Sequence, residues 1–257
     1  MKFIDFFDRI FVISLESRLD RRKGAARELE RIGMPFNSAK VELFLATPPP
    51  SAGSFPGIGA RGCFESHLAV LKKAQMRGLS SVLVIEDDVA FSEKFLRDED
   101  RLVDQLSQTD WDLVHFGYSP EQVGDQDADS VARIYPFFRE IISTVCYCVS
   151  GRVLNRLISY LESLSSRPPG HFEGGPMPID GAYNVFRWRY PDIVRRISIP
   201  TVAHQRSSRS DVYPDLAWFD RTPIIRDIAT GARSLGLPAL GRGLASHWSA
   251  WRTRPRP

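Results

Sequence analysis

The stretch Ser81–Asp88 reads SVLVIEDD, in which four apolar residues are followed directly by Glu86, Asp87 and Asp88. An unbroken apolar run of this kind, rich in β-branched residues, is typical of a strand that is covered on both faces. In open α/β sheets, ligands bind beyond the carboxyl ends of the strands, which is where these acids lie. The stretch therefore predicts a central strand with a functional site at its end.

Apolar strands and amphipathic helices alternate on both sides of this stretch. Further strands are predicted at Ile10–Leu15, Val41–Ala46, Trp111–Phe116, Ile141–Val149 and Ile197–Val202. Helices are predicted from Asp20, as the cap, to Gly33, from Phe64 to Gly78 and over Val153–Leu164, with long loops at Thr47–Gly62 and Arg167–Pro178. This alternation indicates an α/β fold with a mostly parallel central sheet.

Size and composition restrict the class of protein. The chain has 257 residues, of which 43% are hydrophobic and 25% charged, and its three cysteines are too few for a disulfide framework. No apolar run approaches the ~20 residues that span a bilayer. Asp5, Asp8 and Arg9 stand where a signal peptide needs an uncharged core, so we expect a cytoplasmic protein.

The C-terminal segment differs in charge from the rest of the chain. Residues 221–257 contain seven arginines, no lysine and one acid, together with several leucines and two tryptophans. A nucleic-acid-binding domain would spread positive charge over its working face, so no nucleic-acid partner is expected. We predict a folded domain over residues 1–220 and a basic extension over 221–257. The extension either packs on that domain or contacts an anionic membrane surface.

The three adjacent acids are the clearest chemical signal. Neighbouring carboxylates repel one another, and a hard divalent cation such as Mn²⁺ or Mg²⁺ removes that repulsion through oxygen ligands. The alternative is a solvated turn after the strand. Cation binding is the favoured interpretation because the acids follow a buried strand directly.

Two further motifs allow competing interpretations. Residues 57–62 read GIGARG and match the fingerprint of an NAD-dependent oxidoreductase, but about ten Pro/Gly/Ser-rich residues separate them from the preceding strand, which the fingerprint must leave directly. Cys63 and His67 could form a nucleophilic pair, although a hydrogen-bonded histidine that braces the loop is favoured. Cys146 and Cys148 alternate along a predicted strand and are expected in the core.

Several motifs occur in a fixed order between residues 10 and 212. They are residues 11–15 with Arg18, Asp20, Arg21 and Arg22; then Gly59, Gly62, Cys63, Ser66 and His67; then residues 84–89; then residues 178–180; and finally Pro200 with Gln205, Ser210 and Asp211. In this ordered set the chain resembles glycosyltransferase family 25, the lipopolysaccharide-biosynthesis and collagen galactosyltransferases. Ser14 departs from the family, which often has asparagine there.

The resemblance implies a single GT-A-type glycosyltransferase domain and inverting transfer of a hexose to a saccharide or lipid-linked acceptor. The expected donor is a nucleotide sugar, UDP-galactose, bound by Ser14, Leu15, Arg18, Arg21, Arg22, Glu86 and Asp87. Mn²⁺ or Mg²⁺ is expected on Asp88 and Asp87, with His204 completing its ligands.

Inverting transfer also needs a general base on the acceptor hydroxyl. Asp180, which follows a Gly/Pro-rich loop, is the candidate, and capping of a helix is the alternative role for an aspartate at that position. A non-catalytic relative that binds sugar or protein without transferring anything is the other functional hypothesis.

Overall fold

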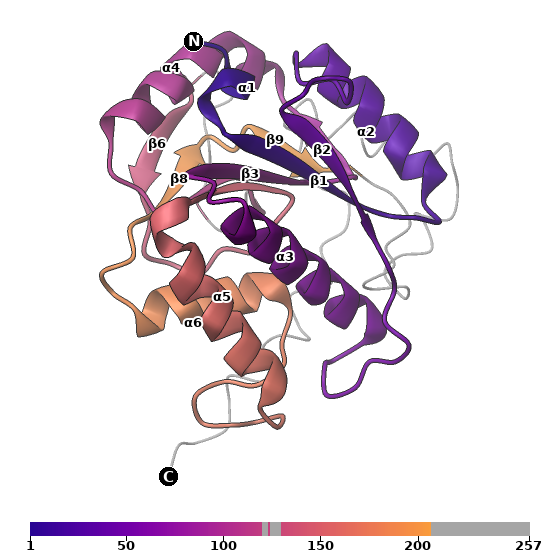
Figure 1. Ribbon diagram of the computed structural model, residues 1–257. Coiled ribbons are helices and arrows are strands. Elements are labelled where there is room, and N and C mark those ends of the chain that lie inside the picture. The colour runs from indigo at the N-terminus through magenta and orange to yellow at the C-terminus, as the bar shows by residue number, and fades with distance from the viewer. Residues whose placement is uncertain (120–122, 124–129, 207–257) are drawn as a thin grey trace, which may run out of the picture. The chain divides into compact units, whose positions relative to one another are not determined.

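The computed structural model describes residues 1–119, 123 and 130–206 (Figure 1). Within these residues, nine strands form one sheet and six helices pack against it. The predicted boundary at residue 220 and the predicted basic extension 221–257 lie outside the described residues. None of the helices in the described part combines the length and hydropathy that a bilayer crossing requires.

The sheet has the strand order β2-β1-β3-β7-β5-β8-β6, and β9 joins it by pairing with both β4 and β5. The strands are β1 (Arg9–Leu15), β2 (Val41–Ala46), β3 (Ser81–Glu86), β4 (Val89–Phe91), β5 (Leu113–Gly117), β6 (Arg133–Pro136), β7 (Cys146–Ser150), β8 (Arg195–Ile199) and β9 (Ala203–Gln205). Along the main path, β2, β1, β3, β5 and β8 run in one direction, whereas β7 and β6 run in the other. The predicted α/β fold with a mostly parallel sheet is confirmed.

Strands β1 and β3 form the buried centre of the parallel half. Residues 10–14 of β1 and 82–85 of β3 are all buried, as their apolar runs predict. Their register pairs Ile13 with Glu86, while Leu15 pairs with Ala46 of β2. The carboxyl ends of these three parallel strands therefore lie side by side, and the acids lie beside the end of β1.

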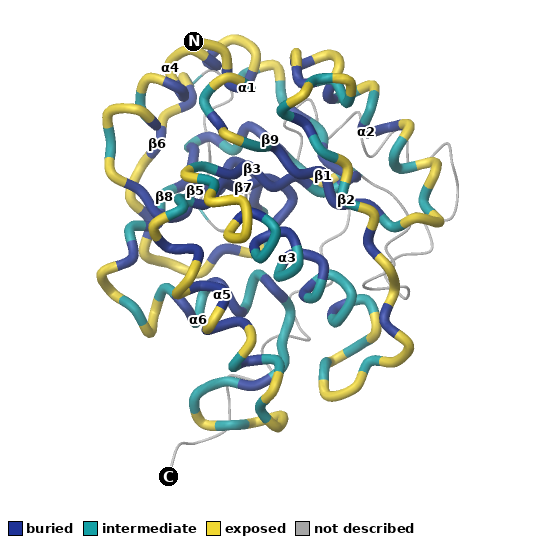
Figure 2. The backbone as a smooth tube through the Cα atoms, viewed as in Figure 1, coloured by how far each residue is buried: buried dark blue, intermediate teal, exposed yellow. Residues whose placement is uncertain are grey.

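Helices cover both faces of the sheet (Figure 1). They are α1 (Phe3–Phe6), α2 (Leu19–Arg31), α3 (Ile58–Met76), α4 (Glu93–Gln108), α5 (Gly151–Ser166) and α6 (Ile179–Arg189). Phe95 of α4 and Val12 of β1 belong to the core on one face, whereas Phe64 of α3 and Phe186 of α6 pack with Ile13 on the other. Figure 2 shows the central strands buried between these layers.

Two helix starts differ from the prediction. Arg18 caps α2, not Asp20, which lies in the first turn and accepts hydrogen bonds of 3.1 Å from the Arg18 guanidinium. That hydrogen bond lowers the pKa of Asp20 to about 2.

Helix α3 begins at Ile58, so Gly62 lies inside it. A Cβ on Gly62 would come within 3.1 Å of the Pro49 ring, so the glycine lets the preceding loop pack on the helix.

Two predicted strands are also wrong in extent. The segment predicted as Ile141–Val149 is a strand only from Cys146, because Ser143 adopts a positive φ of 94° that no strand accommodates. The segment predicted as Ile197–Val202 divides into the end of β8 and a separate β9. Cys146 and Cys148 are fully buried, as predicted.

Candidate active site

A cavity of about 200 Å³ opens at the carboxyl ends of β1 and β3. It is lined by the ends of β1 and β2, by residues 48 and 49, by the first turns of α3, by Arg18 and Arg21, and by Glu86, Asp87, Asp88 and Gln205. Residues of four of the sequence motifs therefore meet at a single cavity.

A larger cavity of about 470 Å³ is lined by residues of α5 and α6 and contains none of those motifs. Its arginines are already paired with acids: Arg156 binds Asp192, and both Arg167 and Arg189 bind Glu173. The smaller cavity is the better candidate because it gathers the chemically reactive groups.

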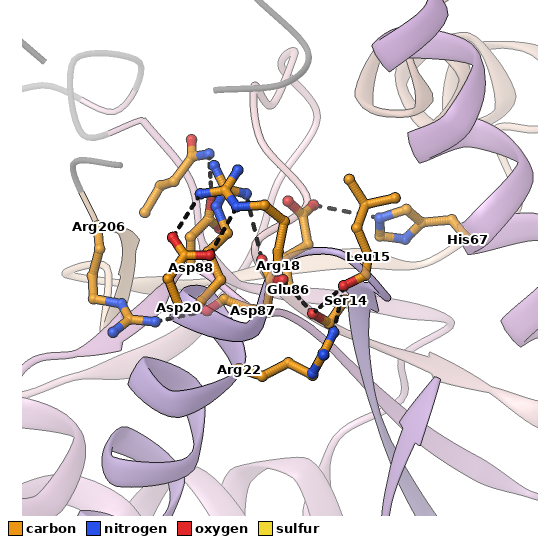
Figure 3. A network of polar contacts seen from close by, with 12 residues as sticks. Ser14, Leu15, Arg18, Asp20, Arg22, His67, Glu86, Asp87, Asp88 and Arg206 are labelled. Carbon is orange, nitrogen blue, oxygen red and sulfur yellow. Dashed lines mark hydrogen bonds and ion pairs between the residues drawn. The ribbon is translucent and has the colours of Figure 1, made fainter. Parts of the chain in front are cut away.

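The end of β1 is tied to the acids by one short hydrogen bond. Ser14 is buried, and its hydroxyl donates to Asp87 Oδ2 at 2.6 Å (Figure 3). The Leu15 carbonyl accepts a hydrogen bond of 2.5 Å from the Arg22 guanidinium. Ser14 and Leu15, predicted as donor-binding residues, line the cavity, whereas Arg22 fixes the end of β1 and is not among the lining residues.

Helix α2 supplies the positive charge. Arg21 Nη1 lies 3.4 Å from Asp87 Oδ1 and 3.1 Å from Asp88 Oδ2. One guanidinium shared by two carboxylates reduces the repulsion between them. Arg18 also lines the cavity and is oriented by its hydrogen bonds to Asp20.

Asp88 is the acid with an unsatisfied oxygen. Its side chain is 2% exposed, and Oδ2 accepts a hydrogen bond of 2.8 Å from Gln205 Nε2. No hydrogen-bond partner reaches Oδ1 within the described residues. Burial raises the pKa of Asp88 to about 6, although Arg21 opposes the shift. An unpaired buried carboxylate oxygen is costly unless a proton or a cation meets it, so Oδ1 is well placed to bind a cation.

Strand β9 lies beside the acids because it pairs with β4, with Val89 opposite Gln205. Arg206 follows, and its guanidinium donates to the Asp87 carbonyl at 2.6 Å while its backbone amide donates to the Asp88 carbonyl at 2.6 Å. His204 lies opposite Ala90 and is not among the residues that line the cavity. The position beside Asp88 is taken by Gln205.

Glu86 contacts a different set of residues from its two neighbours. Its Oε1 accepts a hydrogen bond of 2.7 Å from the Thr144 hydroxyl and lies 3.4 Å from His67 Nε2. His67 is fully buried in α3, and its Nδ1 lies 2.8 Å from the Tyr147 hydroxyl oxygen. The predicted structural histidine therefore contacts the end of β3 and the strand β7, and does not brace the loop before α3.

Comparison with known proteins supports the resemblance. The model of "Glycosyltransferase family 25 (LPS biosynthesis protein)" matches residues 57–181, a segment that includes the first turns of α3, all three acids and Asp180. Residues 57–181 belong to glycosyltransferase family 25. The resemblance predicted from the sequence is confirmed.

The curated proteins similar to this chain include galactosyltransferases and proteins named inactive. Procollagen galactosyltransferase 1 of Danio rerio is 33% identical over 172 residues, covering 59% of this chain and 28% of the relative. Inactive glycosyltransferase 25 family member 3 of Homo sapiens is 33% identical over 129 residues, covering 43% and 22%. The chain thus spans about a quarter of the length of these relatives.

Solved structures give more distant similarities. A glycosyltransferase involved in glycosylation of the major capsid of PBCV-1 is 11% identical, with a TM-score of 0.45, over 77% of this chain and 92% of that chain. A putative glucose-1-phosphate thymidylyltransferase from Bacillus anthracis is also 11% identical, with a TM-score of 0.40, over 82% and 78%.

Asp180 lies in the first turn of α6, close to the end of the family 25 segment. Its Oδ1 accepts the Gly181 amide at 2.8 Å and its Oδ2 accepts the Ser143 amide at 3.2 Å. Burial raises the pKa of Asp180, although these two amides lower it. Pro178 is the N-cap residue, so Asp180 is not the cap, yet it still binds an amide of the first turn. It is not among the residues that line the cavity.

Two contacts of the site were not anticipated from the sequence. Thr144 orients Glu86, and Arg206 holds the backbone of the two aspartates. Both lie far from the acids in the sequence, and neither belongs to a local motif. The pairing of β4 with β9 and of β3 with β7 brings them beside the three acids.

Proposed function

We propose that this chain is an inverting, metal-dependent glycosyltransferase that transfers galactose from UDP-galactose to a saccharide or lipid-linked acceptor. The observation that carries the proposal is the cavity itself. It joins the end of β1, two arginines and the three acids, and it includes a buried carboxylate oxygen that no hydrogen-bond partner reaches within the part of the chain that the structure describes. The family match supports the same reaction class.

The donor's diphosphate requires positive charge. Arg18 and Arg21 line the cavity, and each is already held in place by an acid. Leu15 and Ala46 add apolar surface at the strand ends. We therefore assign the nucleotide to the side of the cavity formed by β1 and β2, with its phosphates toward the arginines.

The acids fit a hard divalent cation. Asp88 would hold Mn²⁺ or Mg²⁺ through Oδ1, with Asp87 as the second carboxylate, since such ions prefer oxygen ligands. A bound ion would supply charge stabilisation for the departing UDP. Ser14 and Gln205 keep the two carboxylates oriented through their hydrogen bonds. His204 as a further ligand receives no support from the cavity lining.

Asp180 is proposed as the general base on the acceptor hydroxyl. A raised pKa suits a carboxylate that must take a proton near neutral pH, and burial provides that shift. The Ser143 and Gly181 amides fix the orientation of both carboxylate oxygens. Those contacts also stabilise the start of α6, so the two roles need separate tests.

The location of the reaction is part of the proposal. We propose that the protein acts in the cytoplasm, in lipopolysaccharide biosynthesis, and that residues 221–257 contact the anionic inner face of the membrane. Seven arginines among leucines and tryptophans support that contact, because each arginine near anionic lipid contributes ~1 kcal/mol. Co-sedimentation with anionic vesicles at low and high salt, with and without residues 221–257, tests it.

Hydrolysis of UDP-galactose measures the proposed reaction without a known acceptor. We expect UDP release that requires Mn²⁺ and is stopped by EDTA. A protein that binds UDP-galactose but releases no UDP with any metal would be a non-catalytic relative. One human relative is named an inactive member of the family. An increase in NAD(P)H fluorescence on mixing would instead support the oxidoreductase hypothesis. The enclosure of Gly59 and Gly62 within α3 gives that hypothesis no support.

A further inference from the structure

Three side chains that commonly bind transition metals meet on one wall of the cavity. Cys63 and His67 are one turn apart on α3, and Glu86 ends β3. The cysteine sulfur, an imidazole nitrogen and a carboxylate oxygen of these residues all lie within 4.8 Å of one another. All three residues line the cavity, so a metal ion can enter from solvent.

His67 is oriented in the way that metal-binding histidines are. Its side chain is 1% exposed, and within the described residues Nε2 makes no standard hydrogen bond but lies 3.4 Å from Glu86 Oε1. Its Nδ1 is held by the Tyr147 hydroxyl at 2.8 Å, and Tyr147 is held in turn by Tyr183 at 2.8 Å. In metal sites, a partner on one ring nitrogen fixes the ring so that the other nitrogen faces the ion.

The distance between the imidazole and the carboxylate matches the spacing of two ligands on a small tetrahedral ion. His67 Nε2 and Glu86 Oε1 are 3.4 Å apart, close to the ~3.3 Å between two ligands on a tetrahedral ion with bonds of about 2.0–2.1 Å. Because Nε2 faces the Glu86 carboxylate, either the ring's own proton or a metal cation fills the space between the two atoms. Burial raises the pKa of the Cys63 thiol, so the sulfur is neutral until a metal binds and displaces its proton to solvent.

We infer that Cys63, His67 and Glu86 form a binding site for a borderline-soft divalent ion such as Zn²⁺, separate from the oxygen site at Asp87 and Asp88. Sulfur and imidazole ligands favour zinc, whereas Mn²⁺ and Mg²⁺ favour carboxylates. The fourth position of the ion faces the cavity. Because it joins α3 to the end of β3, the bound ion stabilises the native state and raises the melting temperature.

Cobalt(II) substitution tests the site with a signal that only a thiolate gives. We expect the metal-stripped full chain to bind one Co²⁺ with an ultraviolet thiolate-to-cobalt charge-transfer band, and one equivalent of Zn²⁺ to abolish that band. Asp88→Asn should retain the band, whereas Cys63→Ser should lose it. Neither readout depends on transfer activity, so this test and that of the proposed function can fail separately.

Alkylation of the wild-type protein gives an independent measurement that needs no variant. Cys63 is partly exposed, whereas Cys146 and Cys148 are fully buried. One equivalent of Zn²⁺ should slow iodoacetamide labelling of Cys63, mapped by mass spectrometry, at least tenfold, and Mg²⁺ should not. The inference is overturned if the wild type gives no charge-transfer band, if Cys63→Ser keeps it, or if Zn²⁺ leaves the labelling rate unchanged.

Discussion

Asp88 and Asp112 are both buried next to strands of the same sheet, yet their surroundings differ. Asp112 precedes β5, and its two oxygens accept hydrogen bonds from Arg152 Nε at 2.6 Å and from the Val194 amide at 2.7 Å. Asp88 follows β3; within the described residues Gln205 donates to its Oδ2, whereas Oδ1 has no hydrogen-bond partner. One carboxylate is satisfied by the fold, and the other leaves an oxygen available.

This difference separates stability from function. A buried carboxylate whose oxygens are all paired joins elements together, as Asp112 joins α5 to the segment before β8. A buried carboxylate with an unpaired oxygen costs stability, and such a cost persists at a site where a ligand relieves it. Its place beyond the carboxyl end of a parallel strand agrees with that interpretation.

The largest expected effect is on transfer by Asp88→Ala. Removal of the oxygen assigned to the metal should abolish transfer, leaving less than a tenth of wild-type turnover with Mn²⁺. The fold should remain intact because the change also relieves repulsion among three clustered acids. Steady-state UDP release and circular dichroism measure the two effects. Turnover above one tenth would show that the metal assignment is wrong.

Asp180 tests an intermediate case, in which both oxygens are paired but a catalytic role is proposed. Asp180→Asn should slow transfer by ~10²–10⁴-fold while the affinity for UDP-galactose stays nearly unchanged. Asparagine supports a helix start about as well as aspartate, whereas alanine does not. Loss of stability in Asp180→Ala with normal turnover in Asp180→Asn would leave only the structural role.

Asp112→Ala should affect stability alone. It leaves the Val194 amide and part of the Arg152 guanidinium unpaired, which should lower the free energy of unfolding by about 2–4 kcal/mol. Asp110→Ala is the matched control, since Asp110 binds the same arginine but is 68% exposed, and it should cost less than about 1 kcal/mol. Urea unfolding distinguishes them, and equal losses would contradict the comparison.

The smallest predicted effect is a pH dependence of stability. Because burial raises the pKa of Asp88 to about 6, the folded protein holds this proton more tightly than the unfolded chain does. The cost of the charged form is present above pH 6 and disappears as the pH falls toward 4. Asp88→Asn, in EDTA, should therefore gain about 1–3 kcal/mol over wild type at pH 7.5 and almost nothing at pH 4. A gain independent of pH would contradict this.

The sequence predicts the central strands β1 and β3 better than the ends of the other elements. The strands around Val12 and Val84 are continuous apolar runs, and local composition is sufficient to identify them. The end of the strand predicted over residues 141–149 depends on Ser143, whose backbone is held by Asp180 from another element. Helix α4 was not predicted, although Phe95 and Leu102 lie on its buried face.

The candidate site was predictable where its residues form local motifs. Ser14, Arg21 and Asp88 lie close together because β1, β3 and the start of α2 are adjacent. The sequence predicts His204 as a metal ligand and Gln205 only as part of a motif, whereas Gln205 is the one that lines the cavity. Local sequence does not reveal which residue of the three-residue strand β9 lies toward the acids. The contacts of Thr144 and Arg206 depend on antiparallel pairings that no local pattern encodes.

Mn²⁺ binding, followed by electron paramagnetic resonance, tests the central claim most directly, because it needs neither donor nor acceptor. The wild-type chain should bind one Mn²⁺ at the acids, and Asp88→Asn should weaken that binding at least tenfold. Asp112→Asn, which keeps a carbonyl oxygen for the Val194 amide, should bind Mn²⁺ as the wild type does. Equal Mn²⁺ affinity in the wild type and Asp88→Asn would contradict the assignment of the unpaired oxygen as the metal ligand.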